Sequence, residues 1–390
     1  MTSAFGGYQN EIYLRGLADE VPIFTTDPTA LEDVARRRMA PGPFGYVVGG
    51  AGSGATVRAN RAAFDRWRIV PRMLTDATNR DLSTTVLGTP MPAPVLLAPV
   101  GVQEIMHPDA ERATARAAAE LGLTMVLSNA ASTSIEDVAE SNGDSSRWFQ
   151  LYWPNDNDVT ASILSRAKAA GYTTLVVTLD TWTLAWRTTD LDQAYLPFLR
   201  GVGCAIPFSD PAFRAGLAKS PEEDPNMAIL RWVGMFTGTD KRWDQLPFLR
   251  EHWDGPIVLK GIQHVDDARR ASEAGMDGIV VSNHGGRQVD GAVASLDMLP
   301  EIVAAVGDRL EVLFDSGIRT GADIVKALSL GAKAVLVGRP YVYGLALGGQ
   351  DGVRHAMRGI LADLDLTLAL SGHRTHRELT PESLRHFASA

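Results

Sequence analysis

Cysteine and long apolar runs are scarce in this sequence of 390 residues. Its single cysteine, Cys204, excludes an internal disulfide and is typical of proteins kept in a reducing compartment. No apolar stretch reaches the roughly 18 residues that a membrane-spanning helix needs. The first residues, MTSAFGGYQNEIYLRG, also lack the basic and apolar regions of a secretory signal peptide. We therefore expect a cytoplasmic protein with no membrane partner.

Positive charge is also in deficit, because 37 Lys and Arg stand against 46 Asp and Glu and give a formal net charge of −9. Nucleic acids and anionic membranes are bound mainly through neutralised phosphates, so neither is an expected partner. The remaining composition, 45% hydrophobic and 21% charged, is that of a soluble globular protein with ample material for a core.

What the sequence has in abundance is an alternation of short apolar runs with longer amphipathic ones. We predict eight strands, at residues 94–99, 124–129, 148–153, 174–180, 256–261, 278–283, 311–317 and 334–340. We predict intervening helices at residues 109–122, 158–171, 265–275 and 320–331, each of which ends in a glycine suited to a left-handed C-cap.

The predicted strands are continuously apolar, which favours a parallel sheet covered on both sides. Eight such units close most economically as an α/β protein with a (β/α)8 TIM barrel. We expect a single domain with an N-terminal helical segment (residues 1–90), a barrel (91–345) and a C-terminal helix and tail (346–390), the helix at about 351–371. An open doubly wound sheet is the alternative, but no glycine-rich dinucleotide fingerprint follows the first strand.

A long insertion follows the fourth predicted strand. Residues 181–255 are too many for an ordinary barrel connection, and they contain several tryptophans, phenylalanines and prolines. A disordered insert would hold fewer aromatic residues. We interpret the insertion as a lid whose closure excludes water and slows product escape. A structural or oligomer-contact role is the alternative, and the two can coexist.

Polar side chains gather at the ends of these strands. The residues are Gln150, Tyr152, Thr178, Asp180, Lys260, His284, Arg287, Asp315, Arg319 and Arg339. Each alone has an ordinary structural explanation, such as a cap, a turn or solvated surface. In a barrel, however, all carboxyl ends of the strands lie on the face where such enzymes do chemistry. Their convergence therefore predicts an active site.

The last two strands carry a pattern typical of a phosphate site. Gly317 and Gly321 flank Arg319, and Gly338 with Arg339 closes the eighth strand. Small residues bring backbone N–H groups close to an anion, and guanidinium groups add positive charge. Phosphate sites of barrel enzymes often follow strands seven and eight. A phosphate-bearing cofactor is favoured over the alternative of turn glycines beside surface arginines.

Several motifs together resemble the FMN-dependent 2-hydroxy-acid oxidase family from about residue 30 to residue 385. They are SNHGGRQ, LFDSGIRTGADIVKAL, VGRP, FQLYW, VTLDT, VLKGI and LLAPVG. YQNEIY, LAPVGV, LDTWTLAWR and LGGQDG are most similar to the members that act on lactate as monooxygenases. A phosphate-binding barrel without turnover is the alternative from a different class, and a colourless purified protein would favour it.

The resemblance implies catalytic roles that make chemical sense. His284 is expected to remove a proton from the substrate, since imidazole titrates near neutral pH. Arg287 and Arg187 are expected to pair with the substrate carboxylate. Asp180 is expected to hydrogen-bond the imidazole and stabilise its cation.

The resemblance also implies substrate-binding phenols and a cofactor, FMN. Tyr152 and Tyr46 match the phenols. The expected FMN-binding residues are Pro99, Val100, Gly101, Ser128, Gln150, Thr178, Lys260, Ser282, Asp315, Gly317, Arg319, Gly338 and Arg339. Among them, Lys260 matches the lysine beside the N1 edge of the flavin, where an ammonium would stabilise negative charge. No metal site is assigned.

The sequence is compatible with two different sets of final products. An oxidase releases keto acid and hydrogen peroxide, whereas a monooxygenase retains both and converts lactate to acetate, carbon dioxide and water. Relatives often have Ala where this chain has Gly101, which favours the monooxygenase or makes room for a bulkier substrate such as mandelate. Relatives also have a larger residue where this chain has Ala130, which indicates extra room. Trp182 and Trp186 are candidates to refill that room.

The expected partners are a small L-2-hydroxy acid, molecular oxygen and further copies of the chain, as a tetramer or octamer. One departure from the family lies after YVVGGAG, where relatives usually carry an acidic residue and this chain has Ser53 and Gly54. The N-terminal segment that carries Tyr46 is therefore expected to be held differently.

Overall fold

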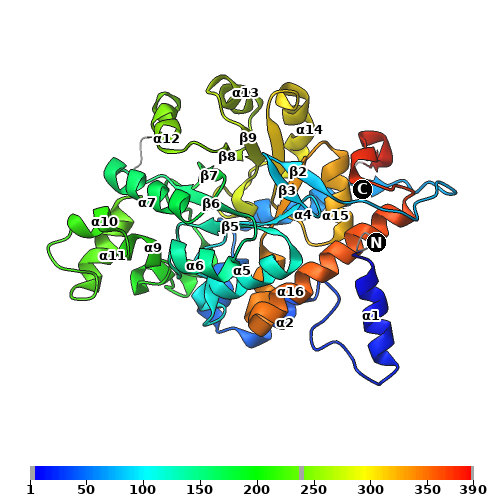
Figure 1. Cartoon of the computed structure of the whole chain (residues 1–390), viewed down its shortest axis with the longest axis horizontal. Helices are drawn as coiled ribbons and strands as arrows, with labels where there is room; N and C mark the ends of the chain where they lie inside the picture. Colours follow the sequence, from blue (N-terminus) through cyan, green and yellow to red (C-terminus); the bar gives the residue numbers. More distant parts are fainter. Residues whose placement is uncertain (1–4, 237–240, 388–390) are drawn as a thin grey trace.

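A closed barrel of eight parallel strands forms the centre of the computed structural model, which describes residues 5–236 and 241–387 (Figure 1). The strands follow one another around the barrel in chain order, and the last pairs with the first. They are β4 (Val95–Leu97), β5 (Thr124–Ser128), β6 (Arg147–Tyr152), β7 (Leu175–Thr178), β8 (Ile257–Ile262), β9 (Gly278–Val281), β10 (Glu311–Phe314) and β11 (Ala334–Val337). The predicted TIM barrel is confirmed.

Six of the covering helices lie between consecutive strands. Four were predicted: α5 (Ala110–Leu121), α7 (Asn157–Ala169), α13 (Val265–Glu273) and α15 (Gly321–Ser329). Two were not, α6 (Ile135–Asn142) and α14 (Ser295–Val306). Pro300 lies inside α14, and a proline in that position argues against a helix because it removes a backbone donor. The apolar residues around it, such as Leu299 and Ile302, are fully buried, and their packing outweighs this preference.

The N-terminal segment is helical in part and also contains strands. Its helices are α1 (Gly7–Gly16), α2 (Leu31–Arg38), α3 (Pro41–Val48) and α4 (Ala55–Asp65), and its strands are β1 (Trp67–Ile69), β2 (Thr84–Val86) and β3 (Thr89–Met91). The β2–β3 hairpin closes the amino end of the barrel, where Val86 and Met91 join the apolar interior. The Trp148 indole in that interior donates to Thr89 Oγ1 at 3.1 Å. This plug leaves the carboxyl end of the barrel for a ligand.

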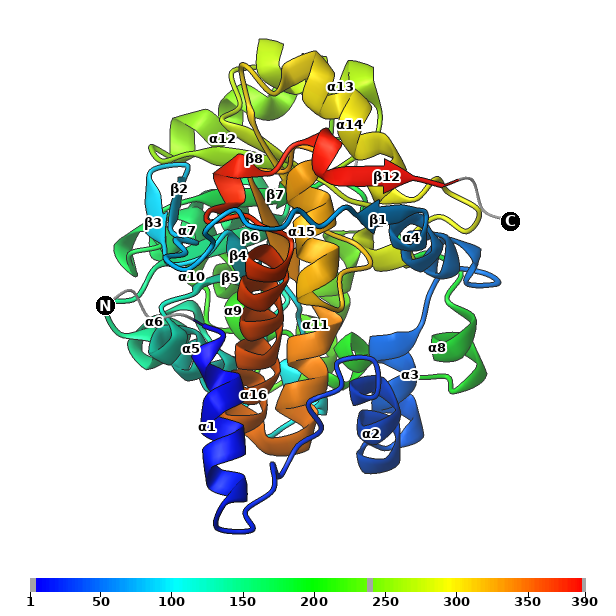
Figure 2. The same ribbon diagram turned by 90° about the vertical axis from the view of Figure 1, so that its right-hand side faces the viewer.

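The C-terminal segment begins earlier than the sequence indicated. Helix α16 (Arg339–Leu370) starts directly after β11 and has non-helical backbone at Gly348 and Gly349, just before the predicted start. It runs beside α1 and α15 (Figure 2), and the tail ends in β12 (Leu384–His386), antiparallel to β1. No described helix, α16 included, combines the length and the apolar character needed to cross a membrane.

The insertion between β7 and β8 contains short helices. They are α8 (Thr188–Asp192), η2 (Pro197–Arg200), α9 (Ala205–Phe208), α10 (Pro211–Ala215), α11 (Pro225–Gly234), η3 (Trp243–Gln245) and α12 (Leu246–His252). The rings of Phe213 and Trp232 are buried and meet edge to face with their centroids 6.0 Å apart. Both rings belong to the apolar cluster that also contains residues of the barrel helices, such as Ile163 of α7, so the insertion packs onto the barrel. Helix α12 lies against α7 as an outer helix.

Candidate active site

A cavity of about 370 Å³ opens at the carboxyl end of the barrel. Most of the predicted site residues line it: Tyr46, Pro99, Val100, Gly101, Tyr152, Arg187, Lys260, His284, Arg287, Asp315, Gly317, Arg319, Gly338 and Arg339. The others, Ser128, Gln150, Thr178, Asp180 and Ser282, are not part of this lining. The tertiary structure thus gathers residues that are up to 293 positions apart in the sequence.

A layer of polar side chains forms the floor beneath the cavity. Side chains of a strand alternate between its two faces, so a residue two positions after an inward-facing one also faces inward. Val126, Trp148, Val176, Val258, Val280 and Leu313 belong to the apolar interior. The polar layer lies two positions beyond them and consists of Ser128, Gln150, Thr178, Lys260, Ser282 and Asp315, all of them buried. Branched apolar residues usually fill a barrel, so this layer indicates a polar ligand above it.

Among the residues of the polar layer, Gln150 indicates a polar ligand most directly. Its side chain is fully buried, and neither its amide nitrogen nor its oxygen has a hydrogen-bond partner among the described residues. An unsatisfied buried polar group costs about 1–3 kcal/mol, so a ligand that offers both a donor and an acceptor would satisfy it. The edge of a flavin ring carries both, and the residues present therefore fit FMN.

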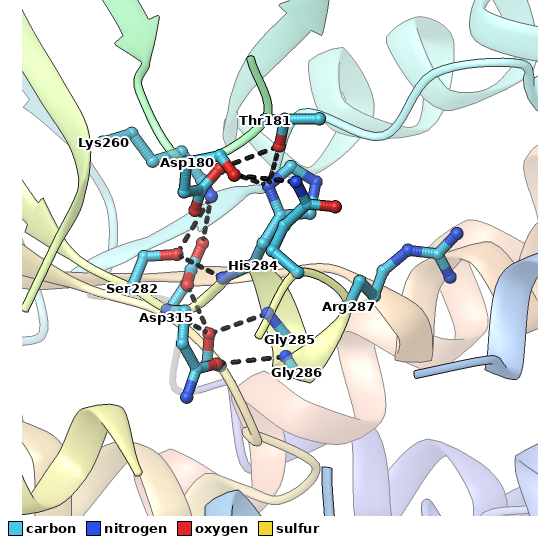
Figure 3. A network of polar contacts seen from close by, with 12 residues as sticks. Asp180, Thr181, Lys260, Ser282, His284, Gly285, Gly286, Arg287 and Asp315 are labelled. Atoms are coloured by element: carbon cyan, nitrogen blue, oxygen red, sulfur yellow. Dashed lines mark hydrogen bonds and ion pairs between the residues drawn. The ribbon is translucent and has the colours of Figure 1, made fainter. Parts of the chain in front are cut away.

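Lys260 supplies a fixed positive charge in the polar layer. Its Nζ lies 3.0 Å from Asp315 Oδ2 and 3.0 Å from Ser282 Oγ (Figure 3). Burial lowers the pKa of Lys260, but the carboxylates of Asp315 and Asp180 outweigh burial and the net pKa is raised. The ammonium therefore stays charged, and it would stabilise negative charge on a flavin ring above it.

Arg319 and Arg339 lie at the predicted phosphate end of the cavity. Burial and the neighbouring charge of Arg339 lower the pKa of Arg319 to about 10. Arg339 donates from Nη1 to the carbonyl of Gly285 and from Nη2 to that of Gly49, each at 3.0 Å. Gly317 has a φ of +102°, which only glycine adopts without strain, and a Cβ there would lie 3.0 Å from a backbone oxygen. A phosphate bound here would lie near the guanidinium groups of Arg319 and Arg339 and near the backbone at Gly317, which has no side chain to block its approach.

Four arginines from the described part of the chain line the cavity. No carboxylate of the described residues forms an ion pair with Arg187, Arg287, Arg319 or Arg339. Buried charges in proteins are normally paired. The excess of positive charge therefore indicates anionic ligands, as a flavin phosphate and a substrate carboxylate would be.

The loop after β9 presents His284 on a tight turn. His284, Gly285 and Gly286 have φ values of +57°, +65° and +79°. Positive φ is uncommon for a residue other than glycine and often accompanies function. Ser282 Oγ accepts the backbone N–H of His284 at 3.1 Å, which fixes this turn (Figure 3).

Asp180 binds the imidazole from the end of β7. Its Oδ1 lies 2.7 Å from His284 Nδ1, so Nε2 is the nitrogen left for the cavity (Figure 3). Burial raises the pKa of Asp180, but His284 and Lys260 outweigh burial and the pKa falls to about 2. Burial lowers the pKa of His284, which Asp180 partly opposes. The resting pair is thus a carboxylate beside a neutral imidazole that can accept a proton.

Gly261 makes room for this carboxylate. It has a φ of +106° within the register shift of β8, and a Cβ there would lie 2.9 Å from the Cβ of Asp180. On its other side Asp180 lines a second cavity of about 420 Å³. Asp180 Oδ2 has no hydrogen-bond partner among the described residues. The geometry therefore concentrates the bonds of the carboxylate on Oδ1.

Arg287 and Arg187 are placed differently from what their predicted role alone would suggest. Arg287 points away from the Asp180–His284 pair in Figure 3 and donates to the carbonyls of Tyr46, Val47 and Gly49 at the end of α3, at 3.2 Å for Val47. Burial and the charge of Arg187 lower the pKa of Arg287 to about 9. Both arginines line the cavity, and their binding of a substrate carboxylate remains a prediction.

The two predicted phenols reach the cavity from distant parts of the chain. Tyr152 ends β6, and its ring stacks on His284 at an angle of 23° with the centroids 6.4 Å apart. Burial raises its pKa, so the phenol keeps its proton and can donate a hydrogen bond. Tyr46 comes from α3, and the guanidinium of Arg287 lies 4.9 Å from the centre of its ring.

Sequence reasoning assigned no role to three polar residues near the site. Thr181 Oγ1 lies 3.0 Å from His284 Nδ1. Gln288 accepts from Arg187 Nη2 at 2.6 Å and donates to the carbonyl of Asp180 at 2.7 Å. Gln288 lies inside SNHGGRQ, and Thr181 directly follows Asp180, so proximity within the motifs was an available signal.

Asp290 is the third of these residues. Its Oδ2 accepts the backbone N–H of Ser53 at 2.7 Å, and its Oδ1 accepts that of Ala55 at 2.8 Å. A carboxylate at a helix N-terminus is favourable, so Asp290 caps α4 from the loop that follows β9. The N-terminal segment is therefore held by an acidic residue from elsewhere in the chain, although Ser53 and Gly54 replace the usual local one.

The chain is similar over nearly its whole length to known proteins. Residues 35–386 match the FMN-dependent dehydrogenase family. The chain is 50% identical over 388 residues to the FMN-dependent alpha-hydroxy acid dehydrogenase qulF of Penicillium citrinum, with 98% of this chain and 96% of that protein covered. It is 40% identical over 362 residues to the L-lactate oxidase of Lysinibacillus sphaericus, with 93% of each covered. The crystal structure of mandelate oxidase has a TM-score of 0.82 at 36% identity, covering 94% of this chain and 100% of that one.

Proposed function

The chain belongs to the FMN-dependent dehydrogenase family and is an FMN-dependent 2-hydroxy-acid oxidoreductase, and from this premise we propose that it is an L-lactate 2-monooxygenase. Lactate and oxygen would give acetate, carbon dioxide and water. The observation that carries the oxidative half of the proposal is the imidazole of His284, held by Asp180 at 2.7 Å in a cavity lined by arginines.

Different residues bind the substrate and accept its proton in the first step, the oxidation of the hydroxy acid. His284 Nε2 accepts the proton of the substrate hydroxyl, and Asp180 stabilises the imidazolium that forms. Arg287 and Arg187 orient the substrate carboxylate, and Tyr152 donates a hydrogen bond from its phenol. Gln150, Lys260, Arg319 and Arg339 would hold FMN, which would supply the acceptor for the Cα hydrogen of the substrate and its two electrons, and molecular oxygen would then take these up as peroxide.

The proposal of acetate as product depends on retention of the first products. Oxidation of lactate yields pyruvate and hydrogen peroxide, and their reaction with each other yields acetate, carbon dioxide and water. The wall of the cavity that comes from the insertion is mostly apolar and includes Trp182, Leu184, Leu196, Phe198, Trp232, Val233 and Phe236. An insertion that closes over the cavity would exclude water and slow the escape of both products.

An oxidase that releases keto acid and peroxide is the second candidate. The same apolar wall favours it, because a single lactate methyl would fill little of that surface and a phenyl group would fill more. Mandelate is therefore the test substrate for this candidate. A kcat/KM for L-mandelate well above that for L-lactate, with peroxide equal to the substrate consumed, would support it over the monooxygenase.

The deciding experiment is a product analysis on the purified FMN-loaded protein. Anaerobic L-lactate should bleach the flavin absorbance, and aerobic turnover should then yield acetate with little pyruvate or peroxide. L-Mandelate is assayed in parallel. If neither substrate bleaches the flavin, the proposed function is wrong. If lactate yields stoichiometric pyruvate and peroxide, the protein is an oxidase.

Substitution of Gly101 tests the retention of products. A Cβ at Gly101 would lie 2.7 Å from the carbonyl oxygen and 3.0 Å from the Cβ of Ala130, so Gly101→Ala must displace this wall of the cavity. We expect product to shift from acetate towards pyruvate plus peroxide, measured as the ratio of the three. Gly359→Ala is the matched control, because a Cβ there meets nothing within 4 Å. An unchanged ratio in Gly101→Ala would contradict the retention proposal.

The pH dependence follows from the depressed pKa of His284. Only the neutral imidazole accepts a proton, and burial lowers the pKa of His284 below its ordinary value of 6.5. We expect kcat/KM to stay level from pH 7 to below pH 6.5 and then to fall about tenfold per unit as the imidazole becomes protonated. A kcat/KM that is already halved above pH 6.5 would contradict this assignment of the base.

We also propose a cytoplasmic homo-oligomer, which the sequence suggested. In support, the end of α1 and the loop after it expose Leu17, Val21 and Ile23 by 85%, 82% and 93% at the edge of the molecule (Figure 2). A second copy of the chain would remove these apolar side chains from water. Light scattering should give the mass of a tetramer or octamer, and cell fractionation should place the protein with cytosolic markers. A monomeric mass would overturn the proposed homo-oligomer, and recovery outside the cytosolic fraction would overturn the proposed location.

A further inference from the structure

Thr181 makes a third polar contact inside the Asp180–His284 pair. Its Oγ1 donates to Asp180 Oδ1 at 2.9 Å and lies 3.0 Å from His284 Nδ1 (Figure 3). The three atoms therefore form a closed triangle, since Oδ1 and Nδ1 are 2.7 Å apart. Thr181 also lines both cavities, so its side chain lies at the partition between them.

The hydrogens in this triangle can be placed by counting. Asp180 is ionised, and its oxygens offer only lone pairs. The single hydroxyl hydrogen of Thr181 points to Oδ1, which leaves the lone pairs of Oγ1 for Nδ1. Two acceptors, Oδ1 and Oγ1, thus face Nδ1 of His284, and that nitrogen must carry a hydrogen. The neutral imidazole is then unprotonated at Nε2, as a base in the cavity requires.

The hydroxyl also restrains the carboxylate. Asp180 Oδ2 is buried and has no hydrogen-bond partner among the described residues, and Asp180 lines the second cavity, so no described hydrogen bond to Oδ2 holds the carboxylate. Both contacts on Asp180 Oδ1 come from Thr181 and His284. Without the threonine hydroxyl, the bond to His284 alone orients the carboxylate, which can then turn further from the line of Nδ1.

We propose that Thr181 is a positioning residue that fixes the tautomer of His284 and the orientation of Asp180. Only the expected effect on the rate of flavin reduction rests on the proposed function; the effect on the His284 tautomer does not. Thr181 does not itself need to touch substrate, and its effect passes through Asp180 and His284. The closest shape without the hydroxyl is valine, and serine keeps the hydroxyl without the methyl group.

The kinetic test compares the FMN-loaded wild type with Thr181→Val and Thr181→Ser. In anaerobic stopped flow with a 2-hydroxy acid that reduces the wild type, Thr181→Val should lower the limiting rate of flavin reduction about 10- to 100-fold. The apparent Kd for the hydroxy acid should stay within about twofold, and Thr181→Ser should restore most of the rate. A Thr181→Val rate within about twofold of the wild type, or an equal loss in Thr181→Ser, would overturn the proposal.

A second measurement does not depend on turnover. Nitrogen NMR of histidine-labelled holoprotein reports which imidazole nitrogen carries hydrogen, and the spectrum of His284→Gln identifies the signals of His284. Wild type and Thr181→Ser should show the Nδ1–H form, and Thr181→Val a mixture. An unmixed Nδ1–H form in Thr181→Val would overturn the proposal. If no hydroxy acid reduces the wild type, the proposed function fails while this measurement still decides the role of Thr181.

Discussion

His284→Gln is expected to slow anaerobic flavin reduction by a 2-hydroxy acid by about 10²- to 10⁴-fold, the usual contribution of a general base. Glutamine can keep a hydrogen bond to Asp180, but its amide cannot accept the substrate proton near neutral pH. Binding of FMN and of the hydroxy acid should persist, because the arginines and the polar layer are untouched. Stopped-flow bleaching measures the rate, and a titration followed by the flavin spectrum measures binding.

The matched control for this substitution is His264→Gln. The side chain of His264 is 69% exposed and lines neither cavity. In His264→Gln, the hydroxy acid should reduce FMN at the same rate as in the wild type. Near-normal bleaching in His284→Gln would remove His284 from its assigned role, and loss of FMN binding in that variant would show a structural role instead.

Lys260→Met is expected to weaken FMN binding and to lower the reduction potential of the flavin. The ammonium stabilises the additional negative charge of the reduced cofactor, so its removal disfavours reduction by about 30 mV for each 1.4 kcal/mol lost. The substitution also leaves the Asp315 carboxylate buried without its cation, at a cost of about 3–5 kcal/mol in stability. The potential is measured against a reference dye, and binding by flavin fluorescence.

The control separates the two effects of this substitution. Asp315→Asn combined with Lys260→Met removes the buried carboxylate together with its partner, so most of the lost stability should return. The low potential should remain, because the ammonium is still missing. A potential like that of the wild type in both variants would contradict the role given to Lys260.

The polar layer and the loop at His284 were largely predictable because they depend on local pattern. Lys260 and Thr178 follow the inward-facing Val258 and Val176 by two positions, and the period of a strand puts them on the inner face. His284 and Arg287 lie in one short motif directly after β9. Four of the six helices between consecutive strands were predictable from their apolar period and terminal glycine, whereas α6 and α14 were missed.

The partners of these residues were not predictable in the same way. Arg287 was expected to pair with the substrate carboxylate, and the structure shows that it also donates to the carbonyls at the end of α3. Ser53 was expected to leave the N-terminal segment held differently, and Asp290 supplies the carboxylate from 237 positions away. Hydrogen bonds between such distant segments depend on how whole elements pack, and no periodicity in the sequence records that packing.

The sequence by itself determined the barrel and the identity of the groups on its rim, because apolar period and strand-end chemistry are properties of neighbouring residues. Only the tertiary structure decided that the Gln150 side chain has no hydrogen-bond partner within residues 5–236 and 241–387, that the insertion lines the cavity, and that Thr181 and His284 both bond the same oxygen of Asp180. These features depend on distances between segments that the chain brings together only when it folds.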